Sequence, residues 1–522
     1  MWSFASIGAN PLTLWTERDD VGNLLERMWP PKVNEVGHLW QAVQETFFMA
    51  FLGTVLAVAL AVPVGFLAAR NVMPIAAVRA VARGLIVATR AVPDLVLALI
   101  FLRVWSIGPL AGVVALGVHS VGMLGKLFAD AIEQIDPKPR EGVAATGAGR
   151  LQELVAGVVP QIIPAFIAAA LYRLDINFRS ATILGLVGAG GMGHYINQYK
   201  GSLRYPELLG LTLLVILLVI AMEAASAAVR SVILGQRNTR TSWLRRANRP
   251  TSAAPLQSSP AERRLTPPWT TDRVAMYLFG GVCVALLALS SVSTDISFGK
   301  FVDGLPRLPR VLWRFVPKNF DWWLPRFWGD FRETVQIGFA ATLLALVFAF
   351  PTGFLAARNV APARWVYAAS RGIVLLLRAL PDLVVAVIFV AALGLGPKPG
   401  VLALSIGIYA FASKLFADAI EEVADGPRDG IRATGATRIQ ESFSSVLSQA
   451  MPSLVGNTLY MLDVSIRSST VLGIVGAGGI GFPLIQANKS LRFEQVGGIV
   501  LVTFCIVYAI ELIANFVRKR II

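Results

Sequence analysis

An internal repeat constrains this chain more than any other feature. Four motifs recur 288 residues later, the last with conservative changes only, and their first copies are FLAARNV at Phe66, KLFADAIE at Lys126, ATG at Ala145 and GLVGAGGMG at Gly185. The copies align without a gap over about 160 residues, from Glu45 and Glu333 to Arg204 and Arg492. Chance does not hold one offset over that length, so the chain is two fused copies of one domain.

The composition places both copies in a membrane. Of the 522 residues, 55% are apolar and 15% are charged, whereas a soluble globular chain carries about 25% charged residues. The mean hydropathy is +0.63. These values exclude a soluble multi-domain enzyme and a disordered chain, and they predict an all-α polytopic membrane protein.

Apolar runs of about 20 residues predict five membrane spans in each copy. In the first copy these runs are Phe47–Ala69, a weaker run between Ile75 and Phe101 that contains four charged residues, Val104–Gly125, Leu154–Tyr172, and Leu208–Val229. One further run, Val274–Thr294, belongs to neither copy. Five spans put the two ends of a copy on opposite sides of the membrane, so two parallel copies need one additional crossing between them. We therefore expect 11 spans, with the N-terminus outside and the C-terminus inside.

The spans divide the chain into six parts. They are an extracytoplasmic or interfacial N-terminal segment (1–44), a first transmembrane domain (45–230), a basic cytoplasmic linker (231–273), an additional transmembrane helix (274–294), a second extracytoplasmic or interfacial segment (295–332) and a second transmembrane domain (333–522). One segment disagrees with this orientation, because Lys300–Arg326 carries six basic residues and would lie outside.

The net charge of +15 fits cytoplasmic loops that face anionic lipid. The basic residues lie between apolar spans and no nucleic-acid-binding motif accompanies them, so we expect no nucleic-acid partner. Cys283, Cys505 and the three histidines form no metal-ligand spacing, so we expect no metal site.

A short polar segment follows the third span of each copy. It reads Glu141-Gly-Val-Ala-Ala-Thr-Gly147 in the first copy and Asp429-Gly-Ile-Arg-Ala-Thr-Gly435 in the second. We expect each segment to form a short helix whose small residues dock into a groove on a partner. A plain helix-turn-helix connection is the alternative.

These segments resemble the EAA loops of ABC-importer permeases. Together with RAxPDL, KLFADAIE and LGxVGAGGxG in both copies, the chain resembles the phosphonate import permeases. The resemblance implies tandem five-helix cores of the methionine-importer type in a bacterial plasma (inner) membrane. It also implies uptake of phosphonate, or of phosphate or phosphite, with a cytoplasmic ABC ATPase dimer and an extracytoplasmic binding protein as partners.

The resemblance further implies that the two loops couple transport to ATP hydrolysis. The positions carried over are Glu141, Ala145, Gly147, Pro160, Asp429, Ala433 and Gly435. The second copy departs from the pattern, with Asp429 for the leading glutamate and Ser448 where Pro160 aligns. No GxxxxGK[ST] motif is present, so this chain binds no cofactor and ATP with Mg²⁺ belongs to the partner ATPase.

A glycine-rich stretch and the residues just before it are the candidate gate and translocation path. The first copy's candidates are Arg179, Ser180, Thr182, Gly188, Gly190 and Gly191, and the second copy's are Arg467, Ser468, Thr470, Gly476, Gly478 and Gly479. The match to GxGxxG carries no βαβ context, so we expect a broken or re-entrant helix and no dinucleotide site. Guanidinium and hydroxyl groups suit the oxygens of a tetrahedral oxyanion.

Charged residues recur at i,i+4 spacing near the spans. Arg90 and Asp94 form such a pair, as do Asp175 and Arg179, and the second copy repeats both. Each pair predicts an ion pair on one helix face, for which a purely structural role is the alternative.

Two other functions compete with an ATP-driven importer. An ion-coupled secondary transporter of a small anion favours inverted repeats and acids near mid-span. An integral membrane enzyme needs a convergent catalytic cluster. The sequence shows parallel copies, few mid-span acids and no such cluster, so it favours a transport subunit that is not itself an enzyme.

Overall fold

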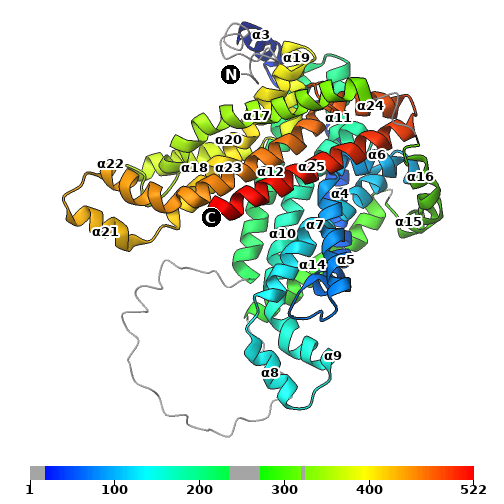
Figure 1. The fold of residues 1–522 in the computed structure, drawn as a ribbon. Helices are drawn as coiled ribbons and strands as arrows, with labels where there is room; N and C mark the ends of the chain where they lie inside the picture. Colours follow the sequence, from blue (N-terminus) through cyan, green and yellow to red (C-terminus); the bar gives the residue numbers. More distant parts are fainter. Residues whose placement is uncertain (1–17, 234–270, 295, 319–323, 522) are drawn as a thin grey trace, which may run out of the picture.

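A computed structural model describes residues 18–233, 271–294, 296–318 and 324–521. Within these residues every regular element is a helix (Figure 1), which confirms the predicted all-α class. The first 17 residues and the greater part of the predicted linker, 234–270, lie outside the described residues.

The same series of helices occurs twice. The first copy consists of α4 (Val36–Ala68), α5 (Ala76–Ala91), α6 (Asp94–Trp105), α7 (Pro109–Glu133), α8 (Pro137–Ala145), α9 (Arg150–Glu153), the π-helix η1 (Leu154–Val158), α10 (Val159–Leu184), η2 (Gly185–Val187), α11 (Gly191–Gly201) and α12 (Tyr205–Ile233). The second copy consists of α17 (Leu324–Leu355), α18 (Arg364–Ala379), α19 (Asp382–Leu393), α20 (Pro397–Glu421), α21 (Asp425–Ala433), α22 (Arg438–Glu441), the π-helix η5 (Ser442–Leu447), α23 (Ser448–Leu472), η6 (Gly473–Val475), α24 (Gly481–Lys489) and α25 (Phe493–Ile521). Helices α18 to α22 begin and end 288 residues after α5 to α9, so the sequence repeat is a structural repeat.

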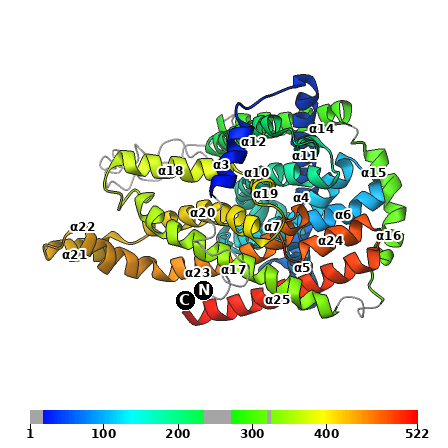
Figure 2. The ribbon, with the colours of Figure 1, turned by 90° about the horizontal axis from the view of Figure 1, so that it is seen from above.

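Among the described residues, five further elements lie outside the copies: α3 (Arg18–Met28), α14 (Thr271–Ser293), α15 (Phe298–Gly304), η4 (Leu305–Arg307) and α16 (Leu308–Arg314). Helix α14 lies beside α12, as Figure 2 shows. Its apolar side chains are largely exposed, including Tyr277, Leu278 and Val284. A helix that shows apolar side chains outward suits contact with lipid, as expected of the additional transmembrane helix.

Seven helical stretches among the described residues are long and apolar enough to cross a membrane. Two bent helix pairs, α5 with α6 and α18 with α19, raise this number to nine. Helices α23 and α25 occupy the positions of α10 and α12 in the second copy, but they do not meet the same criteria over the described residues. The eleven-span count and the orientation stay predictions.

The second predicted span of each copy is sharply bent. The bend is 92° between α5 and α6, and 78° between α18 and α19. Pro93 and Pro381 cap the second helix of each pair, and the preceding Val92 and Leu380 have extended backbones. Proline disfavours helical geometry in the residue before it, which accounts for the break.

Small residues allow the first and third predicted spans of each copy to pack closely, α4 against α7 and α17 against α20. A Cβ atom on Gly65 of α4 would lie 2.8 Å from Phe128 Cβ, and one on Gly353 of α17 would lie 2.7 Å from Phe416 Cβ. Helix packing in membranes relies on such small residues because apolar burial gives little drive there. This contact forms the core of each copy.

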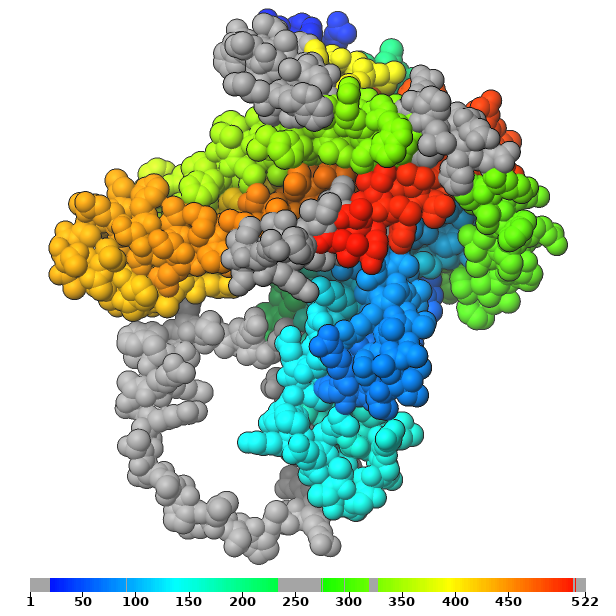
Figure 3. All heavy atoms as spheres, viewed as in Figure 1, coloured from blue at the N-terminus to red at the C-terminus, as the bar shows by residue number. Residues whose placement is uncertain are grey.

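The two copies overlap at one end of the molecule and diverge at the other (Figure 1). The helices of the first copy lead down to α8 and α9, and those of the second lead to the left, to α21 and α22. Figure 3 shows these two ends as separate projections. We call residues 137–153 arm one and residues 425–441 arm two.

Candidate functional site

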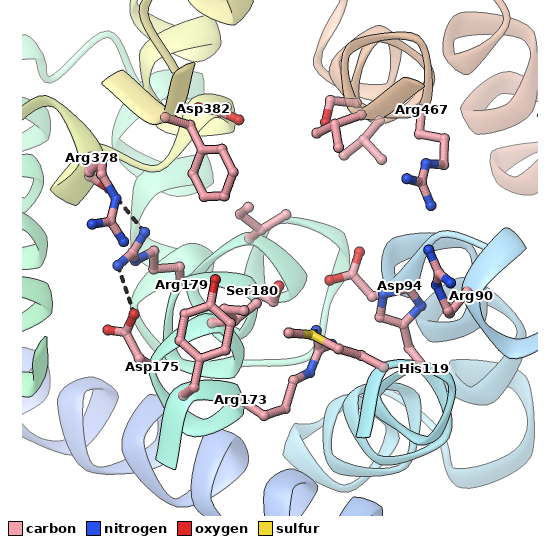
Figure 4. A pocket seen from close by; sticks show the side chains of 18 of the residues that line it. Arg90, Asp94, His119, Arg173, Asp175, Arg179, Ser180, Arg378, Asp382 and Arg467 are labelled. Carbon is pink, nitrogen blue, oxygen red and sulfur yellow. Dashed lines mark hydrogen bonds and ion pairs between the residues drawn. The ribbon is translucent and has the colours of Figure 1, made fainter. Parts of the chain in front are cut away.

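A cavity of about 630 Å³ lies between the two copies (Figure 4). Helices α5, α6, α7 and α10 line it from one side, and α18, α19, α20 and α23 line it from the other. Its six basic and four acidic side chains are Arg90, Lys126, Arg173, Arg179, Arg378, Arg467, Asp94, Asp130, Asp175 and Asp382. Glu223 and Asp463, which lie outside this lining, pair with Arg378 and Arg467 and balance part of its positive charge.

Arg179 lies at the centre of an ion-pair network on one side of the cavity. Its Nη2 lies 2.8 Å from Asp175 Oδ2 and 3.6 Å from Glu223 Oε2. Arg378 of the second copy lies 3.4 Å from Glu223, and its carbonyl oxygen accepts a hydrogen bond of 3.1 Å from Arg179 Nη1. The predicted pair of Asp175 and Arg179 is confirmed, and the network joins the two copies.

Arg467 takes the equivalent place in the second copy. Its Nη2 lies 2.5 Å from Asp463 Oδ2, which confirms the second predicted pair. Figure 4 shows Arg467 facing Arg90 of the first copy, just as Arg179 faces Arg378 of the second. Across the cavity, each copy therefore places one arginine opposite an arginine of the other copy.

The prediction that Arg90 and Asp94 share one helix face is wrong. Arg90 lies at the end of α5 and Asp94 begins α6, so the bend separates them. The same holds for Arg378 in α18 and Asp382 in α19. Sequence spacing indicated an i,i+4 pair, but the proline between the two residues breaks the helix.

The predicted path residues divide into two groups. Ser180 and Ser468 line the cavity beside their arginines. Thr182 and Thr470 are buried outside it, and their hydroxyls donate to the carbonyl oxygens of Phe178 (3.3 Å) and Ile466 (3.5 Å).

The predicted glycines form tight turns at a distance from this cavity. Six have a positive φ between 66° and 110°: Gly188, Gly190, Gly191, Gly476, Gly478 and Gly479. These turns break the helix before α11 and α24, and in the first copy Gly191 N donates to Glu45 Oε2 (2.7 Å) and Met192 N to Thr46 Oγ1 (2.9 Å). A positive φ is unfavourable for a residue with a Cβ atom, so these turns require glycine.

One of these glycines lines a second cavity. Gly476 lies in the wall of a cavity of about 570 Å³, together with Lys200 and Lys489. None of the six predicted glycines lines the central cavity. Their role as a gate stays a prediction.

Two polar side chains of the central cavity were missed by the sequence reasoning, Arg173 and His119, whereas Arg378 was expected only as the partner of Asp382. Arg173 and His119 have no polar counterpart in the second copy, where Met461 and Gly407 stand 288 residues later. A difference between otherwise matched copies was the signal available in the sequence.

The two arms carry the predicted coupling residues at their surface. In arm one, Glu141 and Ala145 of α8 and Gly147 just after it are exposed. In arm two, Asp429 and Ala433 of α21 and Gly435 just after it are exposed in the same way. Gly147 and Gly435 end α8 and α21 with φ values of 78° and 80°. Pro160 lies in the first turn of α10, outside the arm, and is exposed. The predicted short helices are therefore present, and their docking role stays a prediction.

One arginine holds each arm to the membrane domain, the buried Arg428 in arm two and the partly exposed Arg140 in arm one. In arm two, Arg428 Nε donates to Glu441 Oε1 (3.0 Å), and Arg428 Nη2 donates to the carbonyl oxygen of Asn359 (2.9 Å). In arm one, Arg140 contacts Glu153 and donates to the carbonyl oxygen of Asn71 (2.6 Å). Each arm is thus fixed to the turn after the first span of its copy.

The repeated FLAARNV and KLFADAIE motifs meet at that same turn. Asn71 Nδ2 donates to the carbonyl oxygen of Ile132 (2.6 Å), and Asn359 Nδ2 donates to that of Ile420 (2.7 Å). Arg83 pairs with Glu133 at 2.7 Å. The motifs therefore position the base of the arms.

A second arginine reinforces arm two. Arg432 Nε donates to Glu441 Oε2 at 2.7 Å. This hydrogen bond, assisted by that of Arg428, lowers the pKa of the Glu441 carboxyl below its ordinary value. Ala144 stands at the equivalent position of arm one, so the two arms are fixed by unequal sets of contacts.

The chain matches one family twice. The family described as "Binding-protein-dependent transport system inner membrane component" matches residues 61–233 and 349–522, once in each copy. Phosphate-import permease protein PhnE of Mycolicibacterium smegmatis is 42% identical over 516 residues, which cover 98% of this chain and 91% of that protein.

Two further likenesses cover parts of the chain. Phosphite transport system permease protein PtxC of Stutzerimonas stutzeri is 39% identical over 221 residues, which cover 42% of this chain and 79% of that protein. A structure of the MetNI methionine ABC transporter in an inward-facing conformation aligns with 39% of this chain and 100% of its own, at 22% identity and a TM-score of 0.36.

Proposed function

Because the chain belongs to the family of binding-protein-dependent transport system inner membrane components, we propose that it forms both halves of the path of an ATP-driven importer for phosphate, phosphonate or phosphite. The single observation that carries this proposal is the 42% identity, along almost the whole chain, to a phosphate-import permease. The proposed location is a bacterial plasma membrane.

The central cavity supports an oxyanion path. It lies between the copies, and its basic side chains outnumber its acidic ones. Ser180 and Ser468 add hydroxyl donors beside Arg179 and Arg467. Guanidinium and hydroxyl groups together suit the several oxygens of a tetrahedral anion.

The two arms are the proposed contacts for a cytoplasmic ATPase dimer. Each arm presents a short exposed helix, and each is fixed by an arginine to the turn after the first span. A push on an arm would therefore reach the membrane helices as a rigid-body movement. ATP and Mg²⁺ would bind to the partner, and a binding protein would deliver the solute from outside.

Uptake into vesicles tests this function. Vesicles that carry the chain, its ATPase and its binding protein are expected to accumulate labelled phosphate only with ATP, and methylphosphonate or phosphite is expected to compete. The variant Glu141→Lys with Asp429→Lys is expected to assemble in the membrane but to lose ATPase docking and uptake, because it reverses the charge at the leading acidic position of each arm. Uptake driven by an ion gradient without the ATPase would instead establish a secondary transporter.

A further inference from the structure

We propose that Arg173 is a solute-binding residue, and that it makes the oxyanion site of the central cavity one-sided, on the face of the first copy. This inference rests on the proposed function, since it names the residue that holds the transported anion. It assigns unequal roles to two copies whose helices match closely.

Arg173 is a buried cation that makes no direct ion pair among the described residues, and the Asp94 carboxylate of the same cavity acts on it only at longer range. The residue is 4% exposed, yet it lines the central cavity. Among the described residues no carboxylate oxygen lies within ion-pair distance of its guanidinium, and its Nη2 atom has no hydrogen-bond partner. A buried charge is costly unless it is paired, so this group calls for an anion from outside the chain.

A chain of buried polar groups holds this guanidinium in place. Arg173 Nε donates to Ser120 Oγ (2.7 Å), and Ser120 Oγ donates to Asn177 Oδ1 (3.1 Å). Asn177 Nδ2 in turn donates to Thr54 Oγ1 (2.9 Å). All four residues are buried, and they join α4, α7 and α10. Such fixed donors are the means by which a site is preorganised for its ligand.

The second copy lacks the arginine and the serine with which this polar chain begins. Met461 replaces Arg173 and Ile408 replaces Ser120 at the offset of 288 residues. The shared scaffold therefore does not require the arginine or its network.

Each copy presents a carboxylate toward the cavity, Asp94 in the first and Asp382 in the second. A Cβ atom on Gly407, which replaces His119, would lie 2.0 Å from Asp382 Oδ1. The space of the histidine is thus taken by an acidic side chain. The copies therefore differ not in this carboxylate but in the guanidinium of Arg173, which the second copy replaces with Met461.

The other arginines of the cavity are already engaged. Arg179 holds Asp175, Arg378 holds Glu223 and Arg467 holds Asp463. These pairs balance charge within the chain. Figure 4 shows Arg173 extending from α10 on the side of the cavity where His119 lies, apart from the Arg179–Arg378 pair.

The decisive variant is Arg173→Met, which gives the first copy the residue of the second. Because α23 accommodates methionine at this place, the variant is expected to assemble with its ATPase as the natural chain does. ATP-driven phosphate uptake is expected to fall about tenfold or more, as for the loss of a hydrogen bond to a charged group. Arg173→Lys, which keeps the charge, is expected to retain more uptake than Arg173→Met.

Chemical restoration of the charge separates binding from packing. Arg173→Cys is made in a chain that also carries Cys283→Ser and Cys505→Ser. Aminoethyl methanethiosulfonate, which adds a positive charge, is expected to restore uptake, whereas sulfonatoethyl methanethiosulfonate is not. Equal recovery with both reagents would assign Arg173 a packing role and overturn the inference.

The outcomes also separate this inference from the proposed function. If the natural chain takes up none of the oxyanions under ATP, the proposed function fails. If it takes up phosphate and both Arg173→Met and Arg173→Cys do so at the same rate, only the assignment of Arg173 fails.

Discussion

At the scale of single residues, the charged groups of the cavity serve two purposes. Asp175, Arg179, Glu223 and Arg378 tie the copies together, whereas Arg173 lacks a partner for one of its guanidinium nitrogens. Sequence spacing predicted the pair of Asp175 and Arg179 because both lie on one helix. It did not predict the contacts with Glu223 and Arg378, since these depend on how distant helices pack.

Removal of Arg179 is expected mainly to lower the stability of the folded chain, and less to act on the solute path directly. Arg179→Ala leaves the Asp175 side chain, which is 6% exposed, without its cation. We expect a loss of about 3 kcal/mol in the free energy of unfolding, since a broken buried pair leaves an uncompensated charge. Thermal unfolding in detergent measures this loss.

The matched control is Arg179→Ala with Asp175→Asn. It removes the buried negative charge together with its partner, so most of the lost stability is expected to return. A single variant as stable as the natural chain would show that the pair contributes nothing to folding.

At the scale of secondary structure, the sequence predicted the repeated series of helices but not their breaks. Helices α5 to α9 recur 288 residues later because the copies share their apolar pattern and their cap residues. The bends at Pro93 and Pro381 were missed because a run of apolar residues shows length and not direction. The glycine turns were predicted as a helix break, but their distance from the central cavity follows from the packing of α11 against α4.

The first turn of α11 has no room for a side chain at Gly193. A Cβ atom there would lie 2.0 Å from the carbonyl oxygen of Thr182 and 2.7 Å from Gly185 Cα. Gly193→Ala is therefore expected to lower the free energy of unfolding by about 1–3 kcal/mol, as overpacking does. The control is Gly201→Ala in the same helix, where nothing lies within 4 Å of a new Cβ atom. Equal melting temperatures for the two variants would contradict this close contact.

Arm two is expected to loosen when Glu441 loses its charge. The lowered pKa means that the paired carboxylate contributes stability above the ordinary glutamate pKa of 4.5, and that this contribution is lost as the pH falls through the lower folded value. Glu441→Gln is expected to have the same effect at neutral pH. Hydrogen exchange of α21 is expected to increase, whereas the control Glu422→Gln, at the exposed end of α20, leaves it unchanged. Unchanged exchange in Glu441→Gln would refute this anchoring role.

At the scale of the whole molecule, the two copies line the central cavity between them and project two arms. The repeat predicted two like halves, and the family match in each half confirms them. The sequence did not show which arginine of one copy faces which of the other, because that depends on the relation between the copies in space. The difference between the halves at Arg173 and Met461 is what makes a symmetric scaffold one-sided.

The most direct test of this account is the side of the membrane on which the arms lie. Thr146→Cys and Thr434→Cys, both at exposed positions beside the arm helices, are made singly in the cysteine-free chain. A membrane-impermeant maleimide is expected to label both sites in inside-out vesicles alone, and bound ATPase is expected to protect them. Labelling of either site from the outer face would contradict the claim that both arms receive the stroke of a cytoplasmic ATPase.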